Sequence, residues 1–148
     1  MGWVFVTAKK TLFRVPIDGG EPVPINEGAS SRPAISPDGK WIASAYFDPG
    51  RIKTAIYPFT GGEPVKILNL SFWNFYTRWT PDSRALAYID PRSNFNIESQ
   101  PVDGSPPTQL TNFDTDHIFR FAWSRDGKHL AMTRGRFTND VVLINNFR

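Results

Sequence analysis

The amino-acid sequence predicts an all-β fold, and three observations lead to that prediction. Apolar and polar residues alternate with a period of two along short segments, which is the pattern of β-strands. Glycine and proline are frequent, with 11 Gly and 13 Pro among 148 residues, and they fall between those segments. No long stripe of apolar residues follows the 3.6-residue period of a helix.

A hairpin motif occurs three times at constant spacing. The three copies are Ser36-Pro-Asp-Gly-Lys40, Thr80-Pro-Asp-Ser-Arg84 and Ser124-Arg-Asp-Gly-Lys128, and their aspartates lie 44 residues apart. A repeat of this length that holds four strands is typical of a β-propeller blade. The sequence therefore predicts a β-propeller segment of about four blades, two of them complete with four strands and two of them partial with three strands.

A second repeated unit alternates with the first, and each copy is a strand, a glycine turn and another strand. The copies span residues 12–23, 56–65 and, more loosely, 97–108. Their turns hold Gly19-Gly20, Gly61-Gly62 and Gly104, which can adopt the positive φ that tight hairpins need. The two units together predict one domain over residues 1–148.

Counting from both repeats places each strand, and we name the strands of a blade a to d from the inner strand outward. The first blade (1–27) is expected to hold strands b, c and d at 3–7, 11–16 and 22–26. The second blade (28–70) has strands at 32–36, 40–46, 52–59 and 64–69, and the third (71–112) at 75–80, 84–89, 94–101 and 107–111. The fourth (113–148) has strands a, b and c at 119–124, 128–134 and 140–146.

The repeated residues are best explained by folding. Three large residues precede the hairpin turns at equivalent places (Ile35, Trp79 and Trp123), and three small ones follow them (Ala43, Ala87 and Ala131), so both sets are expected in the core. The aspartate of each turn can accept hydrogen bonds from turn amides, as can the Ser or Thr two residues before it. These aspartates therefore need no catalytic role.

Composition and motifs exclude several classes of function. The net charge of +3 is spread over the chain, which disfavours nucleic-acid binding, and no apolar run is long enough for membrane insertion. The chain has no Cys and only two His, His117 and His129, without ligand spacing, so no metal site is expected. A calcium loop beginning at Asn112 fails, because His117 replaces its glycine and Trp123 its closing glutamate. No nucleophile elbow or phosphate loop is present, and we expect neither enzymatic activity nor a cofactor.

Candidate binding residues lie at the end of the blades where the loops vary. Antiparallel strands put the a–b and c–d turns at one end and the d–a and b–c loops at the other, and varied loops on a rigid scaffold carry recognition. Arg32, Tyr76 and Arg120 hold equivalent positions where strand a enters the central channel. They are candidates for binding an acidic peptide or small anion, with three solvated rim residues as the alternative. Trp73 and Phe75, in an aromatic loop, either anchor an interface or cover the end of the core.

The chain resembles the TolB-type propeller family, whose WD-like repeats carry a Pro-Asp-Gly-Lys hairpin. The resemblance rests on segments 36–40, 78–84 and 121–128, and it covers nearly the whole chain. The ending, 140–148, looks like the end of propellers that follow a transmembrane segment in some bacterial serine/threonine kinases and transcriptional sensors. The resemblance implies a sensing or scaffolding domain, and it favours a periplasmic or other extracytoplasmic location. Arg125 and Ser83 depart from the hairpin pattern, and family propellers usually have six or seven blades.

These observations favour a non-enzymatic binding or scaffold module for a peptide, protein or small ligand. Partial blades at both ends expose two blade faces, so we expect self-association, most simply as a homodimer that closes an eight-blade ring. The chain can instead be one part of a longer propeller. Two functional alternatives remain: the gating propeller of a prolyl-oligopeptidase-like serine peptidase without its catalytic domain, and a purely structural fragment.

Overall fold

The computed structural model describes residues 3–8, 11–27, 30–48, 51–70 and 77–138. These residues form thirteen strands and one short 3-10 helix, η1 (Pro91–Ser93). The strands of the first two sheets are β1 (Trp3–Ala8), β2 (Thr11–Pro16), β3 (Val23–Pro24), β4 (Ser30–Ile35), β5 (Trp41–Asp48), β6 (Arg51–Pro58) and β7 (Lys66–Leu68). The strands of the last two are β8 (Thr77–Trp79), β9 (Ala85–Asp90), β10 (Asn96–Pro101), β11 (Thr108–Gln109), β12 (His117–Trp123) and β13 (Leu130–Gly135).

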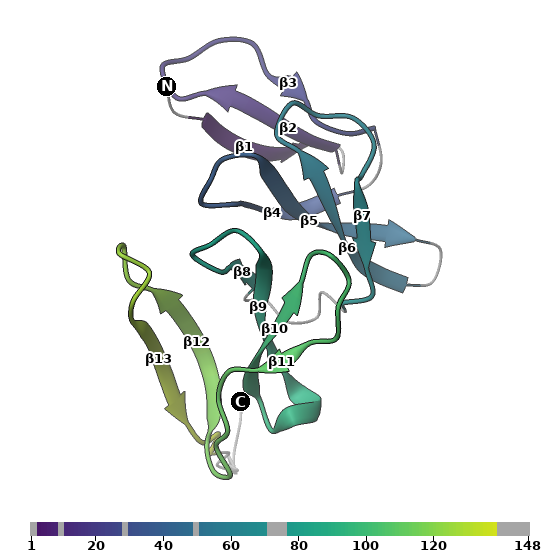
Figure 1. Cartoon of the computed structure of the whole chain (residues 1–148). Helices are drawn as coiled ribbons and strands as arrows, with labels where there is room; N and C mark the ends of the chain where they lie inside the picture. The colour runs from purple at the N-terminus through teal and green to yellow at the C-terminus, as the bar shows by residue number, and fades with distance from the viewer. Residues whose placement is uncertain (1–2, 9–10, 28–29, 49–50, 71–76, 139–148) are drawn as a thin grey trace, which may run out of the picture.

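Each sheet is an antiparallel meander in chain order, as expected for successive propeller blades. The orders are β1-β2-β3, β4-β5-β6-β7, β8-β9-β10-β11 and β12-β13. The sheets follow one another along the molecule, from the N-terminal blade at the top of Figure 1 to β12 and β13 at the bottom. The prediction of two four-stranded blades is confirmed, and the predicted strand 140–146 lies outside the described residues.

The three hairpin turns share one hydrogen-bond pattern. In the first turn, the Asp38 carboxylate accepts hydrogen bonds from the Ser36 hydroxyl and the Lys40 amide, the latter at 3.1 Å. The Ser36 hydroxyl oxygen also accepts a hydrogen bond from the Trp41 amide at 3.0 Å. The same bonds recur around Asp82 and Asp126. The structural role predicted for these aspartates is confirmed, and Arg125 leaves the pattern unchanged.

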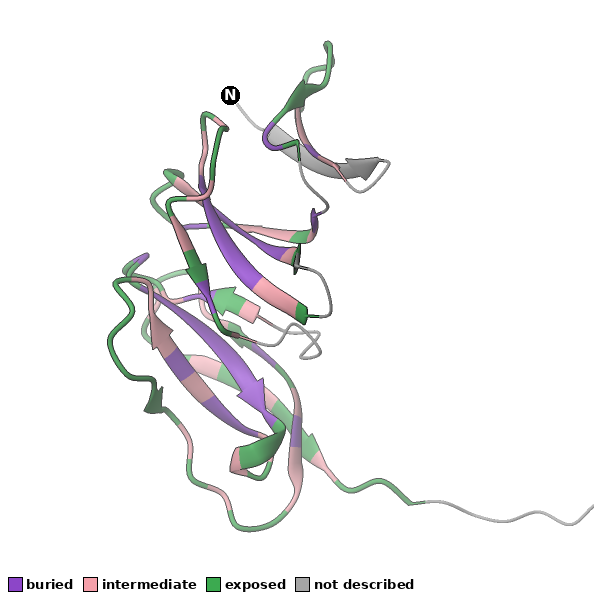
Figure 2. Ribbon diagram, turned by 90° about the vertical axis from the view of Figure 1, so that its right-hand side faces the viewer, coloured by how far each residue is buried: buried purple, intermediate pink, exposed green. Residues whose placement is uncertain are grey.

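Three apolar clusters join the blades, one at each boundary between neighbouring sheets. The first contains Leu12, Ile25, Ile42, Ala55 and Tyr57, and Figure 2 shows buried residues concentrated on the middle strands. The second contains Ala43, Ile56, Leu68, Trp79 and Leu86. The third contains Ala87, Ile89, Ile97, Ile118 and Phe121. Because adjacent strand residues point to opposite faces, Ile42 packs toward the first blade and Ala43 toward the third.

Two of the residues predicted in the core are exposed. Ala43, Ala87 and Trp79 are buried as predicted, but Ile35 is 40% exposed and Ala131 is exposed. Trp79 packs against the preceding blade, where an inner strand is present, whereas the described residues include no strand inward of β1 to cover Ile35. Ala131 lies on the outer face of the last described sheet, so no described sheet packs on it.

The outer strands are shorter than the sequence predicts. β3, β7 and β11 span two, three and two residues, against predictions of 22–26, 64–69 and 107–111. Proline has no N–H to donate to a ladder, and Pro24, Pro64 and Pro107 lie within these predicted ranges. The described part of β8 is Thr77–Trp79, and residues 75–76, where the predicted strand begins, lie outside the described residues. β12 begins two residues earlier than predicted, at His117.

Candidate functional site

Arg32 lies within an irregular segment of the inner strand of the second blade, and Arg120, which pairs with Thr133, lies next to a bulge in the inner strand of the fourth. The β4–β5 register shifts between Ser31 and Ala34, and the β12–β13 register shifts between Ile118 and Arg120. Arg32 has a φ of 55°, in the left-handed region that a side chain rarely adopts. Both arginines are exposed. Because β-bulges redirect side chains and are frequent beside functional sites, the irregular pairing beside each arginine makes these positions candidates for binding.

The other candidate residues cannot be placed beside these arginines. Tyr76, Trp73 and Phe75 lie in segment 71–76, outside the described residues. Arg32 is not among the residues that line the hollow beside Arg120. Arg120 lines this hollow, of about 380 Å³, with Arg78, on the face that carries Ala122 and Ala131.

A further hollow, which sequence reasoning missed, lies between a d–a loop and two b–c loops of the third and fourth blades. It has a volume of about 350 Å³ and is lined by Asn94, Asp114, Asp116, His117, Arg136 and Phe137, among others. Arg136 Nε lies 2.6 Å from Asp116 Oδ1, and this ion pair joins the two loops of the fourth blade. The His117 ring stacks on Phe95 with centroids 4.2 Å apart. Its Nδ1 is buried and has no hydrogen-bond partner among the described residues.

The d–a loop that borders this hollow is fixed by side chains of neighbouring strands and loops. Asn94 and Asn96 both donate hydrogen bonds to the Phe113 carbonyl oxygen, at 3.1 Å and 3.0 Å. The Arg134 guanidinium lies 3.5 Å from the centroid of the Phe113 ring and donates to the Thr115 carbonyl oxygen at 2.7 Å. The loop therefore presents a preorganised surface, a property that lowers the entropic cost of binding.

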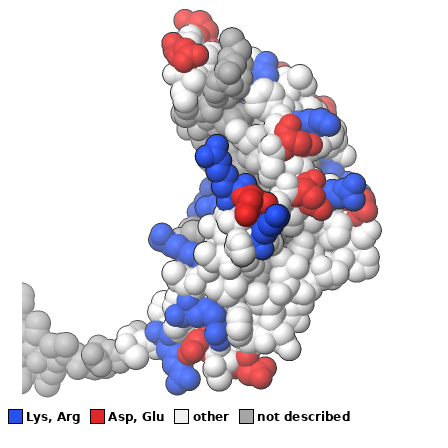
Figure 3. All heavy atoms as spheres, turned by 60° about the vertical axis from the view of Figure 1, so that its left-hand side comes forward, with Lys and Arg blue, Asp and Glu red and all other residues white. Residues whose placement is uncertain are grey.

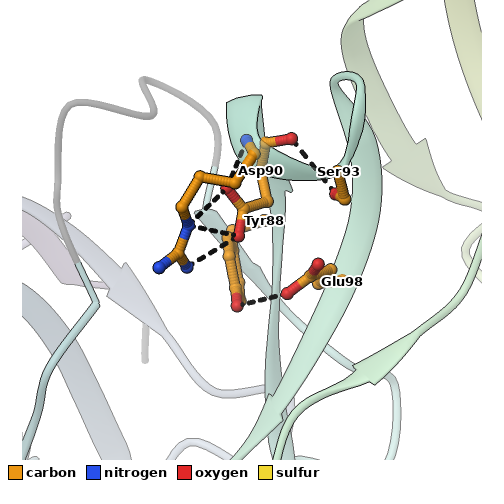
Figure 4. Close-up of polar contacts among 5 residues, drawn as sticks. Tyr88, Asp90, Ser93 and Glu98 are labelled. Atoms are coloured by element: carbon orange, nitrogen blue, oxygen red, sulfur yellow. Dashed lines mark hydrogen bonds and ion pairs between the residues drawn. The ribbon is translucent and has the colours of Figure 1, made fainter.

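The b–c loop of the third blade is held by a buried carboxylate, shown in Figure 4. Asp90 is 3% exposed, and the Arg92 side chain binds both of its oxygens, with Nη2 at 2.7 Å from Oδ2. Burial acts to raise the pKa of Asp90, but the hydrogen bonds from the Arg92 side chain and amide outweigh it, so the pKa is lowered. The Asp90–Arg92 ion pair therefore stabilises the loop that contains η1.

Next to Asp90, the Tyr88 hydroxyl donates to Glu98 Oε2 at 2.9 Å. Burial, followed by the hydrogen bond to Glu98, raises the pKa of Tyr88 far above its ordinary value. Tyr88 is therefore a neutral hydrogen-bond donor at physiological pH, and its contact with Glu98 joins β9 to β10 (Figure 4).

Charge on the described surface is mixed. Figure 3 shows lysine and arginine interspersed with aspartate and glutamate on one face, without a continuous basic stripe. In the described ranges, no three His, Cys, Asp or Glu side chains are placed to hold a metal ion. No helix in that part of the chain is long and apolar enough to span a bilayer.

Comparison with known proteins shows which solved structures share this architecture. No family model matches the chain, and no curated protein matches it. The structure is similar to that of a TolB protein from Agrobacterium tumefaciens, with a TM-score of 0.66 and 23% identity, over 88% of this chain and 49% of the other. It is similar to TolB from Acinetobacter baumannii, with a TM-score of 0.56 and 22% identity, over 81% of this chain and 31% of the other. Tricorn protease matches with a TM-score of 0.61 and 16% identity, over 97% of this chain and 15% of the other.

These likenesses concern the fold. The chain spans 49% or less of the length of each of these solved structures. Strand order, repeat geometry and structural neighbours agree, and the chain folds as a segment of a TolB-like β-propeller.

Proposed function

We propose that this chain is a non-enzymatic β-propeller module that binds an acidic ligand, a carboxylate-bearing peptide or a small anion, at the end formed by the d–a and b–c loops. The observation that carries the proposal is the pair of exposed arginines at equivalent places in the repeat, Arg32 within the irregular segment of β4 and Arg120 beside the bulge of β12. A guanidinium binds carboxylate and phosphate through charge-assisted, bidentate hydrogen bonds.

The rest of the loop-bearing end supports this proposal. Two of its described loops are held by polar contacts, one at Asp90 and one at the Phe113 backbone, so ligand binding need not order these two loops. The opposite end consists of short turns that repeat one bonding pattern and leave little surface that differs from blade to blade. Ligand recognition at the end with varied loops is therefore compatible with stabilisation of the fold by the repeated turns at the other end.

A binding assay with a defined probe tests this function. The probe is a fluorescein-labelled octaglutamate peptide, titrated with protein at low ionic strength and followed by fluorescence anisotropy. Arg32→Gln and Arg120→Gln are each expected to weaken binding about five- to tenfold, since each removes one charge-assisted contact. Arg125→Gln is the matched control, because Arg125 is also exposed but lies in a hairpin turn at the other end. Equal affinity of all four proteins would overturn the proposal.

Self-association is the second part of the proposal. Ala34 and Ala43 of the second blade are covered by Trp79 of the third, whereas the equivalent residues of the fourth blade, Ala122 and Ala131, are exposed. This small-residue face suits another blade, and we infer that a second copy of the chain covers it and closes an eight-blade ring. Sedimentation velocity at micromolar concentration is expected to show a dimer. A stable, folded monomer would contradict ring closure by a second copy.

The similarity to tricorn protease supports one alternative function. That solved structure is a protease, so a similar propeller architecture occurs in proteolytic enzymes as well as in TolB proteins. In that case this chain is the gating propeller of a serine peptidase. The coding sequence that flanks the chain discriminates between the two: a hydrolase domain favours the gating role, and a kinase or sensor with a membrane helix favours the binding module.

A further inference from the structure

We propose a second binding site, distinct from the positions of Arg32 and Arg120, in a groove between the first and second blades. The geometry points to an organic cation as its ligand, a primary amine or guanidinium such as the side chain of a lysine or arginine in a peptide. The groove has a volume of about 460 Å³, and it lies where β3 meets the turn between β6 and β7. These two segments lie side by side near the top of Figure 1, and the Gly62 amide donates to the Ile25 carbonyl oxygen at 2.8 Å.

The floor of the groove is rigid and polar. Ile25, Asn26 and Tyr57 form it, and their exposed fractions are 2%, 7% and 1%. Asn26 Oδ1 accepts a hydrogen bond from the Leu12 amide at 3.0 Å, and its Nδ2 donates to the Tyr57 hydroxyl oxygen at 3.2 Å. These bonds tie the floor to both blades, so the groove exists before any ligand binds.

The rim supplies negative charge. Glu27 and Glu63 both line the groove and are both exposed. Neither carboxylate forms a hydrogen bond or ion pair with any described residue, and no lysine or arginine lines the groove. Lys53 is the cross-strand neighbour of Tyr46 and lies outside the lining. A cation that enters the groove can therefore bind the two carboxylates without first displacing another described side chain from them.

Two tyrosines complete the recognition surface. Tyr46 is half-buried and lines the groove beside the floor residue Tyr57. Burial raises the pKa of Tyr57, the hydrogen bond from Asn26 opposes the rise, and the Tyr46 hydroxyl and the Glu63 carboxylate add to it. Aromatic rings beside carboxylates provide a favourable environment for ammonium and guanidinium groups.

The next blade boundary shows how the repeat accommodates a cation. Gly61 and Gly104 are equivalent, because each donates its amide to the carbonyl oxygen of the proline three residues earlier, at 3.0 Å and 3.2 Å. At Gly104, the ammonium of Lys66 on β7 reaches the turn of the following blade and donates to the Asp103 carbonyl oxygen at 2.9 Å. A Cβ added to Gly104 would lie 2.9 Å from this Lys66 nitrogen.

At the first boundary, the Arg14 guanidinium on β2 donates to the Phe59 carbonyl oxygen of the corresponding turn at 3.1 Å, but Arg14 does not line the groove. β3 consists of Val23 and Pro24, so no side chain of that strand carries a positive charge. The turn that corresponds to the Lys66 site instead ends at Glu63 and borders the groove. Because no lysine or arginine lines the groove itself, we infer that it binds an external ammonium or guanidinium beside Glu27 and Glu63.

The experiment uses a defined probe and the whole chain. The probe is Nα-acetyl-lysine methylamide, titrated into ¹⁵N-labelled protein, and its Nε-acetylated analogue is the neutral control. Saturable amide shifts are expected at Asn26, Glu27, Gly62 and Glu63, and at least fivefold weaker binding of the neutral analogue. Shifts of equal size and midpoint with the neutral analogue would overturn the proposal, as would the absence of saturable shifts at these residues.

Variants of the rim test whether its two carboxylates recognise the probe. Glu27→Gln and Glu63→Gln alter exposed side chains and are each expected to weaken lysine-probe binding at least threefold. Glu21→Gln is the matched control, because Glu21 is an exposed carboxylate outside the groove. Arg32→Gln must also leave lysine-probe binding unchanged, so this site and the proposed site at Arg32 and Arg120 can fail independently. Unchanged affinity in both Glu27→Gln and Glu63→Gln would rule out the two carboxylates as the recognition element.

Discussion

The indole Nε1 of Trp79 donates a 2.8 Å hydrogen bond to the Ala34 carbonyl oxygen, across the boundary between the second and third blades. Trp123 holds the equivalent position one blade later, yet its Nε1 is buried with no hydrogen-bond partner within the described part of the chain. Two copies of one sequence position thus differ in one polar contact. That difference provides a test of how the blades are held together.

Replacing each tryptophan by phenylalanine measures this contact. Trp79→Phe leaves the Ala34 carbonyl oxygen without its donor, and it is expected to lower the free energy of unfolding by about 1 kcal/mol beyond the loss of packing. Trp123→Phe removes a buried donor that has no partner among the described residues, so it is expected to cost less. Urea denaturation of both variants checks the order. Equal losses would show that packing alone sets the contribution of these residues.

Ser83 adds a second polar contact between the same blades. It stands where the other two hairpin turns have glycine, and its φ of 61° is close to the 71° of Gly39 and Gly127. Its hydroxyl oxygen accepts a hydrogen bond from the Asp38 amide at 3.0 Å. The departure from the glycine pattern therefore preserves the turn and adds a contact to the preceding blade.

Two substitutions at this position separate the backbone strain from the hydrogen bond. Ser83→Ala keeps the left-handed strain and loses the acceptor, so it is expected to destabilise the fold by about 1 kcal/mol. Ser83→Gly also loses the acceptor but relieves roughly 1 kcal/mol of strain, so its stability should stay near that of the wild type. Thermal and urea unfolding of the pair give the comparison. If Ser83→Ala were as stable as Ser83→Gly, the strain would be negligible.

The lowered pKa values of the hairpin aspartates predict that the fold loses stability in acid. The hydroxyl of Ser36, followed by the Lys40 amide, lowers the pKa of Asp38 below its ordinary value of 3.8, and the equivalent groups do the same for Asp82 and Asp126. A carboxyl whose pKa is lower in the folded state stabilises the fold above its unfolded pKa, and this contribution is lost as pH falls through the folded pKa. NMR titration of the three carboxyls is expected to give midpoints below 3.8. Midpoints at or above that value would contradict the bonding pattern.

The backbone at Gly61 lies close to the first blade and leaves little room for a side chain. Its φ is 93°, and an added Cβ would lie 3.1 Å from the Ile25 carbonyl oxygen. Gly19 is the matched control, since its φ is 90° and nothing lies within 4 Å of an added Cβ. Gly61→Ala is expected to cost about 1 kcal/mol more than Gly19→Ala, because both variants carry the strain of positive φ and only one meets the neighbouring blade. Similar unfolding midpoints in urea would argue against this close approach.

The sequence predicted the strand order and the hairpin turns because both depend on local, repeated chemistry. The 44-residue spacing of the aspartates located the central strands of each blade to within a few residues. The exposure of Ile35 could not be predicted from the repeat, because burial depends on what packs against a residue, and its equivalents Trp79 and Trp123 have an inner strand of the preceding blade to pack on.

The two proposed binding sites could likewise be predicted only in part from the sequence. The repeat matched Arg32 with Arg120, but the irregular strand pairing beside each of them is visible only in the strand register. The groove combines Asn26 and Glu27 of the first blade with Tyr46 and Glu63 of the second, and the repeated turn that contains Glu63 indicated a folding unit rather than a binding site. The role of the aromatic segment 72–76 stays a prediction.

The most direct test of the proposed recognition at the loop-bearing end is to map where an acidic probe binds. Backbone amide shifts are recorded for ¹⁵N-labelled protein on titration with unlabelled octaglutamate peptide. The proposal predicts saturable shifts in the irregular strand segments around Arg32 and Arg120 and in the neighbouring d–a loop, with the turns at Asp38, Asp82 and Asp126 unchanged. Shifts confined to those turns, or spread evenly over all exposed lysines and arginines, would contradict recognition at this end.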